Sequence, residues 1–358
     1  MADMASGEQP PRDPISMCFH EVMYYGSMVL KSEKKRRLGM FCLNYFGTFV
    51  MVVGSTIPPF TALYSLAEIA FPGYDWILWY ISYFIFAQLW MNFICFWVYH
   101  KNNRVKYWIE NYNHLLPEPE RSYIMAKRGD KIVIKTTTNS DGSEEDDNQP
   151  LLTDLEALPY CTKCDNVIPR RSHHCKVCDV CVLRKDHHCF LFATCVGLAN
   201  ERYFLVYLFY VALACFIGAA CALYWLYFEL NSFNVGFIGN SLLRFSKIHP
   251  LVCVFFWVIG YETFFNTFIS LTMSALYAMG GMATGYFGFE MYYLLNGQTM
   301  HDFYHPNFYP DGDTASDRLR LVFGNYWFLN FFFPLFWQKT VMTPSMAKNI
   351  LCAIPKEL

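Results

Sequence analysis

The segment CTKCDNVIPRRSHHCKVCDVCVLRKDHHCFLFATC, residues 161–195, holds seven of the chain's 14 cysteines and four of its ten histidines. It contains three overlapping C-x2-C pairs, interleaved with histidines. Zinc prefers tetrahedral sites of thiolate and imidazole ligands, and a C-x2-C turn presents two thiolates to one ion. Because disulfides are rare in the cytosol, a histidine-rich cysteine cluster favours metal binding over disulfide bonding. The segment therefore predicts a zinc-stabilised module.

The number of donors in this segment is sufficient for two zinc ions. Two closed sites need eight ligands, and the segment supplies eleven, although spacing alone does not fix which three are left over. Metal binding contributes folding free energy, which explains how a small loop with few hydrophobic residues folds. A thioredoxin-like redox site lacks the expected βαβ pattern, and a RING-type ubiquitin ligase spaces its ligand pairs more widely.

A candidate for catalysis lies within the same segment. A nucleophilic cysteine needs a lowered pKa or a neighbouring base, and the base needs a third group to orient it. Asp186, His187 and Cys189 supply a carboxylate, an imidazole and a thiol within four residues. If His188 binds zinc, the backbone around it is fixed and its neighbours become preorganised. The alternative is that His187 and Cys189 are further zinc ligands or packing residues, and the residues alone leave both readings open.

The composition of the chain indicates a membrane protein. Hydrophobic residues make up 54% and charged residues 16% of the sequence, whereas soluble domains carry about 25% charged residues. A membrane-spanning helix needs about 20 apolar residues. Regions that meet this need are residues 38–63, 76–99, 203–228 and 250–295. The last region fits either one helix with a lead-in or two spans. The net charge of −2 gives no support for nucleic-acid binding.

Lysine and arginine positions predict the orientation of these spans. Basic residues precede the first span at 31–37 and follow the second at 101–106, while the link between those spans carries none. Basic residues favour the cytosolic side of a membrane. The amino terminus and residues 100–202, including the cysteine-rich segment, are therefore expected to be cytosolic.

These features divide the chain into six parts. They are a cytosolic amino-terminal segment (1–37), transmembrane helices 1 and 2 (38–99), a cytosolic linker with an acidic tract (100–158), the cysteine-rich zinc domain (159–202), transmembrane helices 3 and 4 (203–296), and a cytosolic carboxy-terminal segment (297–358). Within the linker, Asp147 with Leu151 and Leu152 fits an acidic dileucine sorting signal or a chance match. Residues 321–337 are rich in aromatic residues, which concentrate at membrane interfaces. We expect this stretch to lie on the bilayer.

The sequence Asp186-His187-His188-Cys189, preceded by this cysteine and histidine pattern, resembles the DHHC family of protein S-acyltransferases. The resemblance covers residues 161–204, and residues 195–200 are similar to the family's C-[V/I]-G-x-x-N motif. It implies an all-α polytopic membrane protein with about four transmembrane helices. A cytosolic two-zinc domain is then expected between spans 2 and 3.

The resemblance also implies roles for individual residues. One zinc ion would be held by Cys161, Cys164, His174 and Cys181, and a second by Cys175, Cys178, His188 and Cys195. Cys189 would then be the nucleophile, His187 the base and Asp186 its orienting partner, while His173 has no assigned role. Arg171 is either a contact for the phosphates of coenzyme A or a solvated charge.

Three positions depart from the family pattern. Phe190 and Leu191 follow Cys189, where the family usually has proline. Residues 299–302, Thr-Met-His-Asp, stand where the family has Thr-Thr-x-Glu, and Arg318 replaces a usual asparagine. Thr299 is nevertheless expected, like Arg171, to contribute to the acyl-CoA side of the site. It is also expected to contact Asp186. That contact requires an odd number of membrane crossings between residues 229 and 296, which favours one span there.

The activity that follows is transfer of a long-chain acyl group from acyl-CoA, such as palmitoyl-CoA, through a Cys189 thioester to cysteines of target proteins. The family resemblance implies location in a Golgi or endoplasmic reticulum membrane, whereas the dileucine indicates an endosomal membrane. The partners could include an accessory subunit. A zinc-stabilised scaffold with weak or partner-dependent transfer is the main alternative. A transporter is a third, supported by Glu262 and Asn266 in an apolar region, which a helix contact or an interfacial position also explains.

Overall fold

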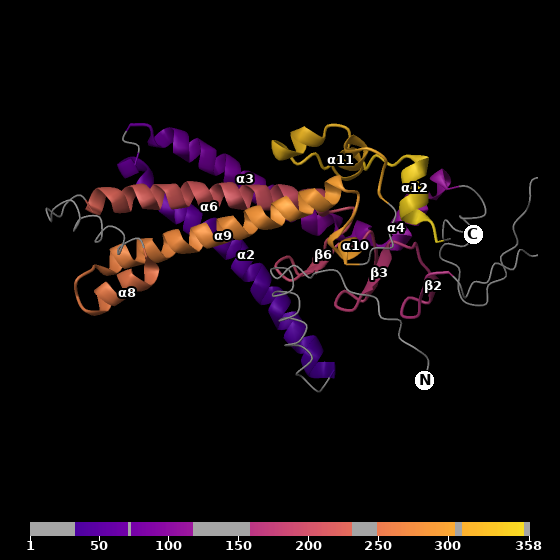
Figure 1. The fold of residues 1–358 in the computed structure, drawn as a ribbon, viewed down its shortest axis with the longest axis horizontal. Helices are drawn as coiled ribbons and strands as arrows, with labels where there is room; N and C mark the ends of the chain where they lie inside the picture. The colour runs from indigo at the N-terminus through magenta and orange to yellow at the C-terminus, as the bar shows by residue number, and fades with distance from the viewer. Residues whose placement is uncertain (1–32, 71–72, 117–157, 231–248, 305–309, 354–358) are drawn as a thin grey trace, which may run out of the picture.

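The computed structural model describes residues 33–70, 73–116, 158–230, 249–304 and 310–353. The residues at 136–152, with the acidic tract and the dileucine, lie outside these ranges. Long helices form one part of the molecule, namely α2 (Glu33–Ala70), α3 (Asp75–Tyr99), α6 (Glu201–Leu230) and α9 (Phe264–Leu295). Helix α6 packs against the other three, and α2 crosses them at an angle (Figure 1). The strands and the carboxy-terminal helices gather at one end of this bundle (Figure 1).

Two of the four predicted spans meet the requirements of a membrane-crossing helix. Within the described residues, Asp75–Asn103 and Glu201–Leu226 are long and apolar enough, whereas the apolar part of α2, Leu38–Gly54, is shorter. Glycine, serine and threonine residues lower the hydropathy of α9. Helix α3 exposes large hydrophobic side chains such as Tyr80 and Val98. Contiguous exposed apolar surface of this kind marks a protein or membrane contact.

Residues 250–295 contain one long helix with a short helix before it. Helix α8 (Pro250–Val258) ends in a turn, and α9 begins at Phe264. The side chain of Asn266 donates a 2.9 Å hydrogen bond to Glu262 in this turn. The two polar residues that had suggested a transporter therefore pair with each other at one end of α9. This position matches the interfacial explanation.

The cysteine-rich segment consists of three short antiparallel ribbons. They pair β1 (Tyr160–Cys161) with β2 (Asn166–Val167), β3 (Ser172–Cys175) with β4 (Val180–Leu183), and β5 (His188–Cys189) with β6 (Thr194–Cys195). Isolated two-stranded ribbons are at best marginally stable in water. These strands have two to four residues each. The ribbons therefore need additional stabilisation, such as bound metal.

Each of the first two ribbons has a C-x2-C turn between its strands, and the two turns share two backbone features. Asp165 and Asp179 directly follow these turns, and each has a φ of 54°. Each residue also donates its backbone N–H, over 2.8 Å, to the carbonyl of the first cysteine of its turn. Aspartate is among the residues that tolerate the left-handed region. The repeated turn thus aims two cysteine side chains toward one point in each ribbon.

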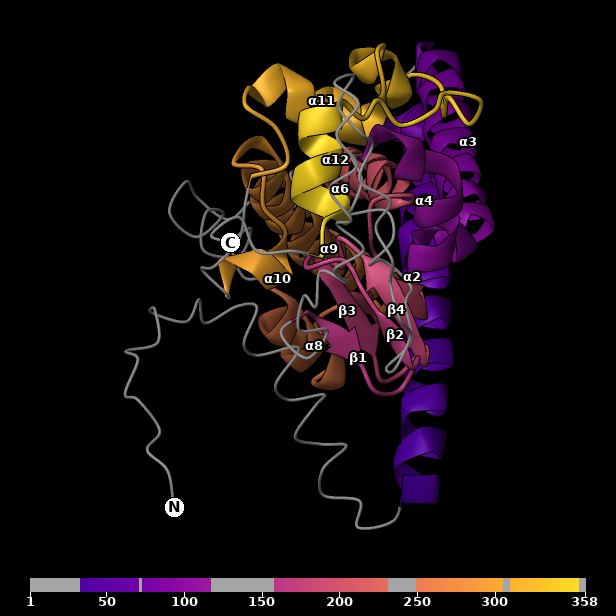
Figure 2. The same cartoon turned by 90° about the vertical axis from the view of Figure 1, so that its right-hand side faces the viewer.

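Shorter helices surround the ribbons. On the amino-terminal side they are η1 (His100–Asn103), α4 (Val105–Tyr112) and η2 (Asn113–Leu115), and on the carboxy-terminal side α10 (Met300–Phe303), α11 (Ala315–Phe323), η4 (Trp327–Phe331) and α12 (Pro344–Leu351). Helix α4 contacts both β4 and α12. The end-on view shows strands β1–β4 below α4 and α12 (Figure 2). The ribbons are thereby held against the helix bundle.

The aromatic stretch at 321–337 divides into a buried and an exposed part. Its first three residues end α11 and are at most 1% exposed, because they form the apolar face of that helix. Beyond them, aromatic side chains including Phe333 and Trp337 are more than half exposed. The Tyr99 hydroxyl donates a 2.7 Å hydrogen bond to the carbonyl of Phe336 and so ties this part to α3. Only the second part fits the expected interfacial segment.

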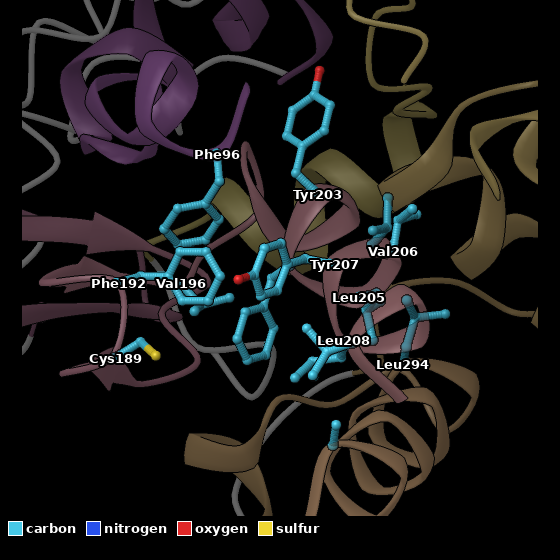
Figure 3. Packing of buried hydrophobic residues seen from close by; sticks show 14 of the residues in the cluster. Phe96, Cys189, Phe192, Val196, Tyr203, Leu205, Val206, Tyr207, Leu208 and Leu294 are labelled. Carbon is cyan, nitrogen blue, oxygen red and sulfur yellow. The ribbon is translucent and has the colours of Figure 1, made fainter. Parts of the chain in front are cut away.

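The hydrophobic core continues from the bundle to the loop that follows Cys189. Phe192 is fully buried, and its ring lies 4.4 Å from that of Phe96 on α3 and 5.1 Å from that of Tyr207 on α6, between centroids. Figure 3 shows this group of rings close to Cys189. Burial of aromatic side chains of this size dominates core energetics. The loop carrying Cys189 is therefore anchored to two long helices.

Candidate active site

The structure brings the cysteine and histidine residues into two groups of four. The first cluster consists of Cys161, Cys164, His174 and Cys181, and the second cluster of Cys175, Cys178, His188 and Cys195. In each cluster the ligand atoms lie within 4.8 Å of one another. These are the two ligand sets implied by the family resemblance. In both clusters the histidine contributes Nδ1.

Distances between the ligand atoms fit a tetrahedral zinc ion. Bond lengths of about 2.3 Å to sulfur and 2.05 Å to nitrogen give tetrahedron edges of about 3.8 Å between two sulfurs and 3.5 Å between sulfur and nitrogen. In the second cluster, Cys178 Sγ lies 3.7 Å from Cys195 Sγ and 3.3 Å from His188 Nδ1. In the first, Cys164 Sγ lies 3.5 Å from Cys181 Sγ and 3.4 Å from His174 Nδ1. Both clusters can therefore hold zinc without rearrangement.

Each histidine ligand has a second contact through its other ring nitrogen. His188 Nε2 lies 3.2 Å from Oδ1 of Asn44, a buried residue of α2. His174 Nε2 lies 3.4 Å from Oδ1 of Asp179. An oxygen that accepts from the outer nitrogen fixes the tautomer and orientation of a metal-binding histidine. Asn44 was not found from sequence, because nothing local links it to a residue 144 positions away.

Asp186, His187 and Cys189 lie together beside the second cluster. Asp186 Oδ2 is 2.5 Å from His187 Nδ1, and the His187 ring also contacts the Cys189 side chain. All three are buried or nearly so. The arrangement has the order acid, imidazole, thiol that activates a cysteine nucleophile.

Strand pairing places the thiol and the zinc ligand on opposite sides of one ribbon. In β5 and β6, His188 pairs with Cys195, and Cys189 pairs with Thr194. Neighbouring residues of a strand point to opposite faces. The ribbon extends back through a 2.9 Å bond from the Val196 N–H to the His187 carbonyl. Metal at the second cluster would thus fix the backbone of both His187 and Cys189.

The residue after Cys189 lies against a glycine of α2. A β-carbon at Gly47 would come within 2.6 Å of the Phe190 carbonyl oxygen, so only glycine permits this close approach. The Phe190 ring meets the His188 ring at 5.1 Å in an edge-on contact. Phe190, which stands where the family usually has proline, therefore packs the loop after Cys189 against the second cluster.

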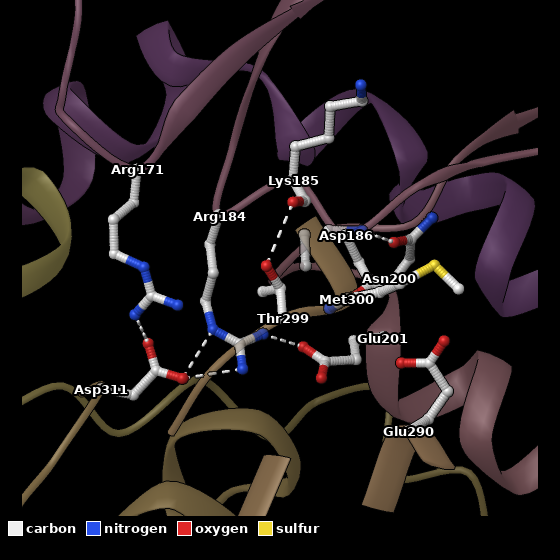
Figure 4. Close-up of polar contacts among 12 residues, drawn as sticks. Arg171, Arg184, Lys185, Asp186, Asn200, Glu201, Glu290, Thr299, Met300 and Asp311 are labelled. Carbon is white, nitrogen blue, oxygen red and sulfur yellow. Dashed lines mark hydrogen bonds and ion pairs between the residues drawn. The ribbon is translucent and has the colours of Figure 1, made fainter. Parts of the chain in front are cut away.

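The segment after α9 reaches the candidate catalytic residue Asp186 through its backbone. The Met300 N–H donates a 2.6 Å hydrogen bond to Asp186 Oδ1, and the Thr299 hydroxyl donates to the Lys185 carbonyl at 3.4 Å (Figure 4). Thr299 and Asp302 form a reciprocal capping box at the start of α10. Thr299 was expected to contact Asp186. Thr299 lies close to Asp186, but its side chain caps α10, and the hydrogen bond to Asp186 comes from the Met300 N–H.

The contacts of Arg171 exclude one of the two alternatives considered for it. Its side chain is 3% exposed, so it is not a solvated charge. It forms ion pairs with Asp302 and Asp311, and Asp311 also pairs with Arg184, which in turn pairs with Glu201 (Figure 4). Two carboxylates within reach compete with any phosphate for Arg171. Its contact with coenzyme A stays a prediction. These linked ion pairs connect the ribbons to α6 and α10. The sequence analysis did not find three of their members, namely Arg184, Glu201 and Asp311.

The pKa values of the catalytic pair follow from these contacts. Burial alone would lower the pKa of His187, but the Asp186 carboxylate and the Cys189 side chain hold it well above its ordinary value. Burial alone would raise the pKa of Asp186, but hydrogen bonds from His187 and Met300 lower it. Both shifts favour the ionised carboxylate and a strongly basic imidazole. Such an imidazole can take the proton of a neighbouring thiol.

Comparison with known proteins agrees with this geometry. Residues 155–307 match the family described as DHHC palmitoyltransferase. The match includes both clusters, Asp186, His187 and Cys189, and the segment 299–302. A search of curated proteins found no match. The match to the DHHC palmitoyltransferase model thus covers the segment in which the sequence resemblance was found.

Proposed function

We propose that the chain is a protein S-palmitoyltransferase that carries the acyl group on Cys189. The observation that carries this proposal is the Asp186, His187 and Cys189 arrangement, held between the second cluster and the helix bundle. Such an arrangement activates a thiol, and the family acts on palmitoyl groups. Residues 100–202 would face the cytosol, where coenzyme A thioesters are available.

The reaction would proceed in two thioester exchanges. His187 takes the proton of the Cys189 thiol, and the thiolate attacks the carbonyl carbon of acyl-CoA. A new bond forms to Cys189 Sγ, the bond to the coenzyme A sulfur breaks, and His187 returns the proton to that sulfur. In the second exchange His187 deprotonates a target cysteine, and that thiolate attacks the thioester carbonyl carbon. The bond to Cys189 Sγ breaks, and His187 returns the proton to this sulfur. One thioester replaces another in each step, so positioning and thiol activation are the main requirements.

The two zinc ions would act on structure. The first cluster would hold the ribbons β1–β2 and β3–β4, and the second would fix the β5–β6 ribbon that carries Cys189. Metal supplies the folding free energy that such short strands lack. Neither cluster includes Cys189, so no step of the transfer needs zinc chemistry.

The acyl chain would lie among the long helices. Burial of a chain of about 15 methylenes at about 0.8 kcal/mol each gives on the order of 10 kcal/mol. An apolar recess between α2, α3 and α6 is lined by residues including Pro59, Ile85, Leu89 and Ala214. The four long helices would all cross the membrane, in the Golgi, the endoplasmic reticulum or an endosome. Acceptors would be cysteines close to its cytosolic face.

Release of free coenzyme A tests this proposal. Purified chain in detergent is mixed with palmitoyl-CoA and a lipid-anchored peptide that contains one cysteine. We expect a burst of one coenzyme A per chain, then steady release with acylation of the peptide. Cys189→Ser should show neither phase, because its hydroxyl is a much weaker nucleophile. Equal release and peptide acylation by Cys189→Ser would contradict the proposal.

A further inference from the structure

A buried carboxyl group from α9 lies at the catalytic pair and has no part in the two exchanges. Glu290 is 3% exposed, and its Oε1 lies 3.9 Å from Nδ1 of His187. This oxygen has no hydrogen-bond partner among the described residues. Figure 4 shows Glu290 on the same side of the site as Asp186. A buried polar atom without a partner is costly, so its presence calls for an explanation.

The distribution of hydrogen bonds indicates which of the two carboxyl groups is charged. Ligand atoms of Asp186, His187 and Glu290 all lie within 4.8 Å of one another. Two buried carboxyl groups that share one imidazole do not both ionise. Asp186 receives hydrogen bonds from Met300 N–H and from His187, whereas Oε1 of Glu290 receives none in the described part of the chain. Both Asp186 oxygens are thus already acceptors, so a hydrogen bond between the two carboxyl groups needs its proton on Glu290.

The other charged groups nearby are already balanced. Arg184, a buried arginine close to the site, pairs with Glu201 and Asp311. Its charge is therefore matched by two carboxylates other than Glu290. A neutral carboxylic acid has one O–H donor, and Asp186 is the negatively charged acceptor beside it.

We propose that Glu290 is a positioning residue, whose neutral carboxylic acid donates a hydrogen bond to Asp186 and holds the Asp186 and His187 pair in register with Cys189. This inference rests on the proposed acyl transfer and extends its catalytic apparatus to α9. His187 and Asp186 would then be held from three sides, by Met300, by the second cluster through His188, and by Glu290. A small rotation of the imidazole is costly, because misplacement of a catalytic group by about 1 Å can slow a reaction about 100-fold.

Two substitutions at Glu290 separate hydrogen bonding from packing. E290Q keeps the shape and an N–H donor but cannot ionise, whereas E290L fills the space without a donor. Tyr292→Leu, on an exposed position of the same helix, is the matched control. Each purified chain is first checked for two bound zinc ions. The rate of alkylation of Cys189 by iodoacetamide is then measured by peptide mass spectrometry, and acyl-enzyme formation is followed at several palmitoyl-CoA concentrations.

We expect E290L to slow both Cys189 alkylation and the maximal rate of acyl-enzyme formation by about 10- to 100-fold, with little change in the palmitoyl-CoA concentration at half-maximal rate. E290Q should restore both rates to within about 3-fold, and Tyr292→Leu should match the unsubstituted chain. Wild-type rates in E290L would overturn the inference. So would E290Q as slow as E290L, because that result requires an ionised Glu290.

The alkylation rate separates this inference from the proposed function. It reports the state of Cys189 and needs no acyl-CoA. If the unsubstituted chain alkylates rapidly but forms no acyl-enzyme, the acyl transfer is contradicted. In that case, slow alkylation in E290L with recovery in E290Q would still support the positioning role. Equal alkylation in all four chains would overturn it.

Discussion

The first and second clusters have the same ligands but different surroundings. Each has three cysteines and one histidine whose Nδ1 faces the cysteine sulfurs, and in each the first two cysteines lie in a turn followed by an aspartate at φ 54°. The first cluster lies on ribbons β1–β2 and β3–β4, and Asp179, the residue beside its histidine, has a side chain that is 87% exposed. The second cluster includes the β5–β6 ribbon, and Asn44, beside its histidine, is buried.

This difference indicates how one kind of metal site serves two purposes. The ribbons around the first cluster carry none of the three proposed reacting residues, so a metal ion there would mainly stabilise the fold of the ribbons. Around the second, His188 lies between His187 and Cys189 in sequence, so a metal ion bound there would fix the backbone on both sides of the proposed reacting groups. Loss of the first cluster should therefore affect stability most, and loss of the second should affect chemistry directly.

The largest expected difference comes from removing one ligand of each cluster. Cys195→Ser and Cys161→Ser should each lower the zinc content from two ions per chain to one, because structural zinc binding supplies on the order of 10 kcal/mol. Cys195→Ser should slow acyl-enzyme formation at least about 100-fold, since the β5–β6 ribbon loses its anchor. Cys161→Ser should lower the melting temperature but slow acylation only about 10-fold. Zinc analysis, a thermal melt and acyl-enzyme rates check the pair.

Two results would break the distinction between the clusters. One is equal loss of acylation in both variants at a temperature where both remain folded, which would mean that the shared β3–β4 ribbon couples the clusters fully. The other is normal acylation by Cys195→Ser with one zinc ion bound. That outcome would mean that the second cluster does not hold the catalytic groups.

The sequence predicted the local parts of this site well. The C-x2-C spacing and the count of eleven donors indicated two zinc ions, and the family resemblance sorted the ligands into the sets that the structure brings together. Asp186, His187 and Cys189 are neighbours along the chain, so their types and spacing were sufficient to suggest catalysis. Long apolar runs likewise predicted the long helices, although in the described part of the chain two of them meet the requirements of a span.

The parts that the sequence did not reveal come from distant segments. Asn44 reaches His188 from α2, Met300 and Glu290 reach Asp186 from beyond α6, and Arg171 pairs with Asp311 across 140 residues. Each looks ordinary in its local sequence, an amide or a charge beside apolar residues. Only the packing of the helices against the ribbons shows that Arg171 is a buried pair partner rather than a surface charge.

A smaller effect is expected from the residues that support each histidine ligand. Asn44→Leu removes the acceptor of His188 Nε2 and should weaken zinc binding at the second cluster by about 10- to 100-fold. Asp179→Gly removes the exposed partner of His174 and keeps a residue that accepts positive φ, so we expect less than about a 3-fold change. Competition with a chromophoric chelator measures both. A larger effect in Asp179→Gly would reverse the proposed difference between the clusters.

Formation of a thioester on Cys189 tests the central claim most directly. Purified chain is incubated with an alkyne-tagged palmitoyl-CoA, beside Cys189→Ser, and the label is read before and after hydroxylamine, with mass spectrometry to locate the modified residue. We predict a label on Cys189 that hydroxylamine removes and that Cys189→Ser lacks, with two zinc ions in both chains. No label on Cys189 in a chain that holds both zinc ions would contradict the account and favour a zinc-stabilised membrane scaffold.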